Sequence, residues 1–235
     1  MSLCKRVFEK ITGATVFRDS LPRGVSLERD LRRIYPKNMH EIWDVGAHKG
    51  ETTVRLHSHF TNSCIRSFEP ARANYKALLD CCSSYQNQFC YNFAFGPEER
   101  KTTMQIRSVS VLNSLAANLN LPEEDDLHSE QIEVRTIDSF LGKENIDSID
   151  LLKIDVEGYE KEVLHGARNS LTAGKIKFLY LETGIDERFV PFSELIDELE
   201  PFNIYPYAMY EQTPHWSGKQ KLWYWNALFA KEKYL

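Results

Sequence analysis

Two kinds of segment alternate along this chain, short apolar ones and amphipathic ones, and this alternation limits the possible folds more than any other feature. Apolar segments of strand length stand at residues 41–47, 64–70, 88–95, 148–156 and 175–183. Segments with apolar residues at helical spacing follow four of them, at residues 51–60, 75–82, 159–171 and 195–202. Strands that alternate with helices predict a doubly wound α/β fold around a mostly parallel sheet.

The C-terminal quarter departs from this alternation. Residues 204–210 and 222–230 are aromatic-rich segments of strand length with no helical pattern between them, so we expect them to pair antiparallel at one side of the sheet. Further short strands are predicted at residues 102–109 and 131–137. No internal repeat or linker interrupts the pattern. We therefore predict one domain over residues 36–235, with residues 1–35 as an N-terminal helical arm packed on it.

The composition is that of a globular protein and excludes several other classes. The chain has 235 residues, of which 42% are hydrophobic and 27% charged, and its net charge of −5 argues against a nucleic-acid binder. No segment approaches the roughly 20 apolar residues of a membrane span, and the N-terminus lacks the apolar core of a signal peptide. Five cysteines without a CxxC pair argue against a disulfide framework or a zinc site, and they indicate the cytoplasm.

In doubly wound sheets, ligands bind beyond the carboxyl ends of the strands. The first such end is a glycine turn, in which Gly46 and Gly50 are spaced G-x-x-x-G. Backbone N–H groups at the start of the following helix favour an anionic group. Asp44, just before the turn, can hold a ligand's ammonium group or instead satisfy N–H groups of the loop.

Acidic residues follow two other strands. Glu69 stands 23 residues after Gly46, where a carboxylate can accept hydrogen bonds from two ribose hydroxyls. Asp155 and Glu157 follow the strand at residues 148–156 and can bind a divalent metal, act as a general base or orient a substrate. The structural alternative is that Glu157 caps the next helix and Asp155 orders the loop.

Several segments together carry a family resemblance. They are VGAHKGETT at residues 45–53, SFEP at 67–70, NSL at 113–115, VRTIDSF at 134–140, LLKIDVEGYEKEVLHGA at 151–167 and NALF at 226–229. With these segments the chain resembles the FkbM-like family of S-adenosylmethionine-dependent methyltransferases over about residues 20–230. The resemblance implies a Rossmann-like, seven-stranded sheet whose last strand is antiparallel.

The resemblance also implies S-adenosylmethionine as the cofactor. The methionine end would lie along the glycine turn, the ribose at Glu69, and the adenine near Pro70 and residues 92–95. The residues that we predict to bind the cofactor are Asp44, Gly46, His48, Gly50, Thr52, Thr53, Glu69, Ala94 and Asp155.

The implied reaction is O-methylation of a small-molecule or glycan acceptor, of sugar or polyketide type. A hydroxyl nucleophile must lose its proton or be acidified by a metal. We predict Asp155, His48 and Glu157 as catalytic residues, with Glu182 and His215 as further candidate bases. A divalent metal is left open, with Asp155, Glu157 and Glu182 as its candidate ligands.

Three other functions are weighed against this one. A nucleotide-dependent oxidoreductase is disfavoured because G-x-G-x-x-G is missing. A nonenzymatic binding module of the same fold would be expected to lose the glycines or Glu69, and both are present. A base-flipping nucleic-acid methyltransferase usually has an aromatic-proline tetrapeptide where this chain has DVEG. The sequence leaves open whether the chain forms a homodimer.

Overall fold

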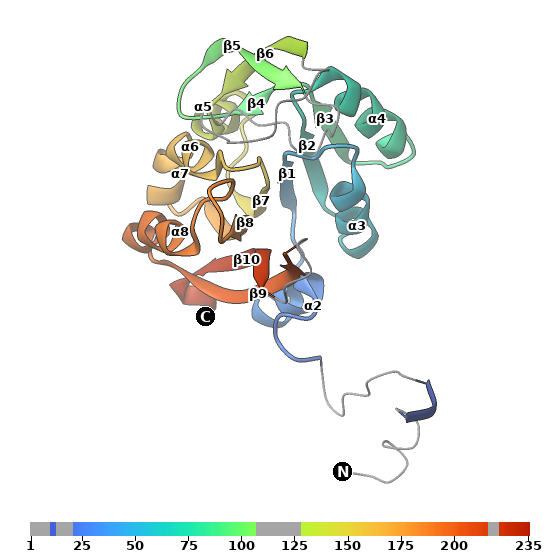
Figure 1. Cartoon of the computed structure of the whole chain (residues 1–235), viewed down its shortest axis with the longest axis vertical. Coiled ribbons are helices and arrows are strands. Elements are labelled where there is room, and N and C mark those ends of the chain that lie inside the picture. Colours follow the sequence, from blue (N-terminus) through green and yellow to red (C-terminus); the bar gives the residue numbers. More distant parts are fainter. Residues whose placement is uncertain (1–9, 13–20, 107–127, 216–220) are drawn as a thin grey trace.

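A seven-stranded sheet forms the centre of the protein. Figure 1 shows the computed structural model, which describes residues 10–12, 21–106, 128–215 and 221–235. Its strand order is β3-β2-β1-β7-β8-β10-β9. The strands are β1 (Glu41–Val45), β2 (Cys64–Phe68), β3 (Gln88–Tyr91), β7 (Ile149–Ile154), β8 (Ile176–Gly184), β9 (Ile204–Pro214) and β10 (Leu222–Lys231). Neighbours from β3 to β8 pair in parallel, and β10 pairs antiparallel with both β8 and β9. The predicted fold class is confirmed, including the antiparallel last strand.

Helices cover both faces of this sheet. They are α2 (Leu27–Ile34), α3 (Glu51–His59), α4 (Arg72–Cys82), α5 (Ile137–Lys143), α6 (Glu160–His165), α7 (Arg168–Thr172) and α8 (Phe192–Leu199), with 3-10 helices at Glu200–Phe202 and Glu232–Tyr234. Strand β7 is buried along its whole length, with Leu152 in the core beneath α5–α8 and Leu151 in the core beneath α2 and α3. Burial on both faces explains why its sequence is almost continuously apolar.

A second, three-stranded sheet lies beside the first, and one of its strands comes from the segment predicted as a single strand at residues 88–95. It contains β4 (Ala94–Phe95), β6 (His128–Arg135) and β5 (Arg100–Ile106), in that order. The strand predicted at residues 88–95 is therefore two strands in different sheets. The turn between them is held by Asn92, whose Nδ2 donates to the carbonyls of Glu69 (2.9 Å) and Pro70 (2.8 Å).

Within the predicted N-terminal arm, α2 packs against the sheet, whereas residues 10–12 are exposed. Leu27 and Leu31 of α2 are buried, and the Asp30 carboxylate accepts a hydrogen bond of 2.9 Å from the hydroxyl of Tyr210 in β9. Most of the arm before residue 21 and the NSL segment at residues 113–115 lie outside the described residues. The domain boundary at residue 35 stays a prediction. No helix within the described ranges combines the length and the apolar character needed to cross a membrane.

Candidate active site

A cavity of about 220 Å³ opens at the carboxyl ends of β1, β2 and β7, where a sheet of this kind binds ligands. Six of the nine predicted cofactor residues border it: Gly46, His48, Thr52, Glu69, Ala94 and Asp155. Glu157, the remaining predicted catalytic residue, borders it as well. The other three predicted cofactor residues, Asp44, Gly50 and Thr53, do not.

The glycine turn is shaped by close packing. Gly46 has φ +76°, and a Cβ placed on it would lie 1.8 Å from the carbonyl oxygen of Asp155. Only glycine therefore lets the end of β1 pack on the backbone that leaves β7. Gly50, with φ +97°, begins α3, and Glu51 and Thr52 of the first turn border the cavity. N–H groups of a helix's first turn lack partners within the helix, so they are donors available to an anion.

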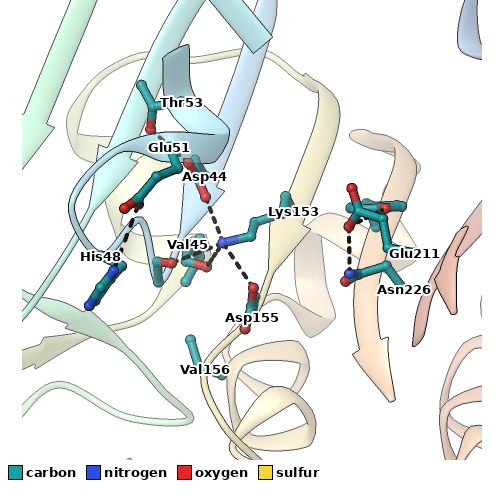
Figure 2. Close-up of polar contacts among 12 residues, drawn as sticks. Asp44, Val45, His48, Glu51, Thr53, Lys153, Asp155, Val156, Glu211 and Asn226 are labelled. Atoms are coloured by element: carbon teal, nitrogen blue, oxygen red, sulfur yellow. Dashed lines mark hydrogen bonds and ion pairs between the residues drawn. The ribbon is translucent and has the colours of Figure 1, made fainter. Parts of the chain in front are cut away.

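Asp44 is an internal structural group. Its side chain is fully buried, with one oxygen accepting from the Thr53 hydroxyl at 2.7 Å and the other 2.8 Å from Lys153 Nζ (Figure 2). The Thr53 hydroxyl also lies 2.8 Å from that of Ser67. These contacts join β1, β2, α3 and β7 beneath the turn. These contacts are internal, as in the structural alternative for Asp44, but they come from the side chains of Thr53 and Lys153 and not from N–H groups of the loop.

Lys153 was not among the predicted site residues, but it lies at the centre of the site. Its Nζ donates to the carbonyl of Gly46 at 2.9 Å and lies 3.5 Å from the Asp155 carboxylate (Figure 2). Burial disfavours its charge, but Asp44 and Asp155 outweigh burial and raise the pKa of Lys153. A signal was present in the sequence: a lysine inside the apolar run LLKID must be buried, and a buried charge requires a partner.

Glu69 closes the cavity at the end of β2. It is 5% exposed, and its two carboxylate oxygens accept hydrogen bonds of 2.9 Å from the N–H groups of His48 and Ala71. Burial raises its pKa to about 7, although these two hydrogen bonds oppose the shift. Each carboxylate oxygen has a second lone pair, so Glu69 can still accept bonds from a ligand's hydroxyls.

Acidic side chains gather on the β7 and β8 side of the cavity. One carboxylate oxygen from each of Asp155, Glu157 and Glu182 lies within 4.8 Å of the others. Burial and then repulsion from Asp155 raise the pKa of both Glu157 and Glu182. Glu157 is also held at φ +55°, a costly backbone conformation for a residue other than glycine. Glu160 orders this loop, because its carboxylate accepts from the N–H groups of Val156 and Gly158.

His48 borders the cavity on the glycine turn. Its Nδ1 lies 3.7 Å from a carboxylate oxygen of Glu51, and burial lowers its pKa (Figure 2). It is also held at φ +51°. His215, in contrast, does not border the cavity but lies beside Trp223, with 5.4 Å between their ring centroids.

The opposite wall of the cavity is apolar. It is formed by Phe68, Phe93, Ala94, Phe95 and Met104. The ring centroids of Phe68 and Phe95 lie 4.6 Å apart, and both rings pack against buried Trp43 and Phe140. This wall is a rigid surface suited to a flat aromatic group.

This strand order, its reversed last strand and a cavity at the carboxyl ends of the strands define the Rossmann-like methyltransferase fold. The family model described as "Methyltransferase FkbM domain" matches residues 44–204, and the chain belongs to that family.

Individual relatives resemble parts of the chain. It is 32% identical to the 2-O-methyltransferase NoeI of Sinorhizobium fredii over 76 residues, which are 31% of this chain and 30% of that protein. It is 29% identical to Methyltransferase 1 of Beauveria bassiana over 148 residues, which are 53% of this chain and 57% of that protein. The crystal structure of Methyltransferase FkbM from Methylobacillus flagellatus aligns with a TM-score of 0.54 at 18% identity, covering 91% of this chain and 46% of that one. The chain thus spans less than two thirds of each of these relatives, and the last similarity concerns the fold alone.

Proposed function

We propose that this protein binds S-adenosylmethionine in the cavity and methylates a hydroxyl group of a small-molecule or glycan acceptor. The main support is the cavity itself, which has an apolar wall on one side, an acidic wall on the other and a glycine turn between them. Membership of the FkbM methyltransferase family points to the same reaction. The name of the Sinorhizobium fredii relative, a 2-O-methyltransferase, supports oxygen as the acceptor atom.

The residues present fit the chemistry of this cofactor. The first turn of α3, at Glu51 and Thr52, offers N–H groups to the methionine carboxylate. Glu69 offers a buried acceptor to the ribose hydroxyls, and the apolar wall offers a surface to the adenine. The acidic wall favours the positive charge of the sulfonium group, which S-adenosylhomocysteine lacks. Asp44, Gly50 and Thr53 support the turn from below.

The chain's own residues position the acceptor and remove its proton. When bound, the cofactor supplies a methyl carbon that bonds to the acceptor oxygen as its bond to sulfur breaks, with the electron pair left on sulfur. Asp155 borders the cavity and is our first candidate for accepting the hydroxyl proton, with Glu157 and His48 beside it. The buried walls exclude water and favour a fixed approach, and positioning of this kind contributes much of the catalysis in such displacements.

The test has two measurements. Calorimetry should show binding of S-adenosylhomocysteine and no binding of NAD. Purified protein with S-[methyl-³H]adenosylmethionine should label at least one member of a panel of glycans, lipid-linked sugars and polyketides. Binding of NAD in place of S-adenosylhomocysteine would support an oxidoreductase. Cofactor binding with no labelling across the panel would instead support the nonenzymatic module.

We also propose a cytoplasmic location, as the sequence predicts. Cys64, Cys81, Cys82 and Cys90 are free thiols, which fits a reducing compartment. Fractionation of cells that express the tagged protein tests this location. The absence of a nucleic-acid partner stays a prediction, and a homodimer stays a possibility that the sequence leaves open.

A further inference from the structure

Three carboxylates meet at the ends of two neighbouring strands, beside the proposed cofactor contacts. Asp155 and Glu157 follow β7, and Glu182 lies near the end of β8. One oxygen from each lies within 4.8 Å of the other two. Asp155 and Glu157 also border the cavity, so the cluster faces the space in which a ligand would lie.

A second observation concerns Glu182 alone. Its side chain is 8% exposed, and its Oε2 is buried with no hydrogen-bond partner among the described residues. The carboxylate nevertheless points into the cluster, because one of its oxygens is within 4.8 Å of both Asp155 and Glu157. Burying an ionised carboxylate beside two other acids without a partner is costly, so Glu182 must either hold a proton or face a cation that the described residues do not supply.

The cationic side chains nearby are engaged elsewhere. Lys153 Nζ lies 2.8 Å from Asp44 and 2.9 Å from the Gly46 carbonyl, but 3.5 Å from Asp155. Arg188 attracts Glu157 electrostatically, while its Nε and one terminal nitrogen donate to Asp186. Lys153 attracts Glu182 electrostatically, but its ion pairs within the described residues are with Asp44 and Asp155.

We propose that Asp155, Glu157 and Glu182 bind a divalent cation of the Mg²⁺ or Mn²⁺ type. A ligand set of oxygens alone is the one that such hard cations prefer. Two oxygens on opposite sides of one Mg²⁺ are about 4.2 Å apart, twice the usual metal–oxygen distance. Adjacent oxygens are about 3.0 Å apart, and of three ligands at most one pair can be opposite. The three carboxylates, whose oxygens lie within 4.8 Å of one another, must therefore draw closer together when the cation binds.

The role of the cation rests on the proposed function, whereas its binding site does not. Because two of its ligands border the cavity, a bound cation has coordination positions open toward the acceptor. It would hold the acceptor hydroxyl and lower its pKa, so that the proton leaves more readily to water or to a carboxylate.

Metal binding is tested directly, without relying on turnover. Chelator-treated protein is titrated with Mn²⁺, followed by electron paramagnetic resonance, and with Mg²⁺ by calorimetry, each with and without saturating S-adenosylhomocysteine. We expect one Mn²⁺ per chain. Glu182→Gln should weaken the affinity for Mn²⁺ at least about 10-fold, since even the loss of a group that only supports a ligand lowers metal affinity by that factor. Glu194→Gln removes the same charge from the exposed face of α8 and should bind Mn²⁺ as the wild type does.

Other outcomes separate the two proposals. Wild-type protein that binds S-adenosylhomocysteine but no Mn²⁺ overturns the metal site and leaves the proposed function standing. Wild-type protein that binds Mn²⁺ but no S-adenosylhomocysteine overturns only the proposed function. Unchanged Mn²⁺ affinity in Glu182→Gln also overturns the site. If Glu182→Gln does not fold, Glu157→Gln, at a more exposed position, takes its place with the same expected loss.

Discussion

Glu69 shows how a single buried side chain sets a pH dependence. In the free protein its pKa is raised to about 7, chiefly by burial, whereas two ribose hydroxyls require the ionised form as their acceptor. Binding must therefore release a proton below that pKa. We predict that affinity for S-adenosylhomocysteine rises with pH up to about 7 and is flat above about 8, falling at most about tenfold per pH unit on the acid side.

Calorimetry between pH 5.5 and 8.5 measures this dependence. Glu69→Ala should bind about 10- to 100-fold more weakly at pH 8, the usual cost of losing hydrogen bonds to a charged group. The variant should also lose the slope. A wild-type affinity that does not change with pH, or a Glu69→Ala variant that binds as tightly as the wild type, would remove the ribose role.

Lys153 is the residue whose loss should most affect stability. It is buried between Asp44 and Asp155, and its removal leaves Asp44 as an unpaired buried charge. Lys153→Met should lower the free energy of unfolding by about 3–5 kcal/mol, as is usual when one partner of a buried pair is removed. Lys161→Met, which breaks an exposed pair with Glu194, should cost about 0–1 kcal/mol. Urea denaturation measures both, and equal losses would contradict the role of Lys153.

At the scale of elements, the strands could be predicted where burial alone determines them. The runs that become β1, β2, β7 and β8 are apolar because both faces of the sheet are covered, and this leaves a direct mark on the sequence. The break between β3 and β4 depends on contacts of Asn92 with carbonyls more than 20 residues earlier, and such contacts leave no local pattern.

The site residues likewise divide into those that a local sequence pattern predicts and those that depend on distant contacts. The sequence placed Gly46, Glu69 and Asp155 at strand ends, and all three border the cavity. The burial of Asp44 was not predictable from its neighbours, because its partner Lys153 lies 109 positions away. Glu160 orders the loop after β7 by accepting from two backbone N–H groups, a role that the sequence offered to Asp155, and residue type alone does not separate the acids of this segment.

The turn that joins β1 to α3 gives a prediction at this scale. A Cβ on Gly46 would lie 1.8 Å from the Asp155 carbonyl, on a backbone at φ +76°. Gly46→Ala should therefore destabilise the fold by at least about 2 kcal/mol, the combined cost of the left-handed backbone and the overpacked contact. Gly142→Ala in α5 is the control, because no described atom beyond its chain neighbours and its own helix backbone lies within 4 Å of the added Cβ, and it should be neutral or stabilising by up to about 1 kcal/mol. Denaturation curves in which both variants match the wild type would contradict this account of the turn.

At the scale of the whole molecule, the sheet brings two half-sites together at one edge. The glycine turn and the end of β2 contribute the half with Gly46, His48 and Glu69, while β7 and β8 contribute the half with Asp155, Glu157 and Glu182. The first half holds groups suited to the cofactor, and the second holds carboxylates suited to the acceptor's proton or to a cation. Substitutions in the two halves should therefore affect different constants.

Asp155→Asn is the sharpest test of this division. The change keeps the shape of the side chain but removes its charge, so its Lys153 contact and its place in the acid cluster lose an anion while the cofactor half is untouched. We predict that kcat falls at least about 100-fold, the low end for loss of a general base, while the Kd for S-adenosylhomocysteine changes less than about threefold. Glu69→Ala should show the reverse, with a raised Kd and a kcat near that of the wild type at saturating cofactor. Single-turnover rates and calorimetry on both variants measure the two constants separately. If Asp155→Asn raises the Kd and leaves kcat normal, then Asp155 belongs to the cofactor half and the proton is taken by another residue, with Glu157 as the next to test.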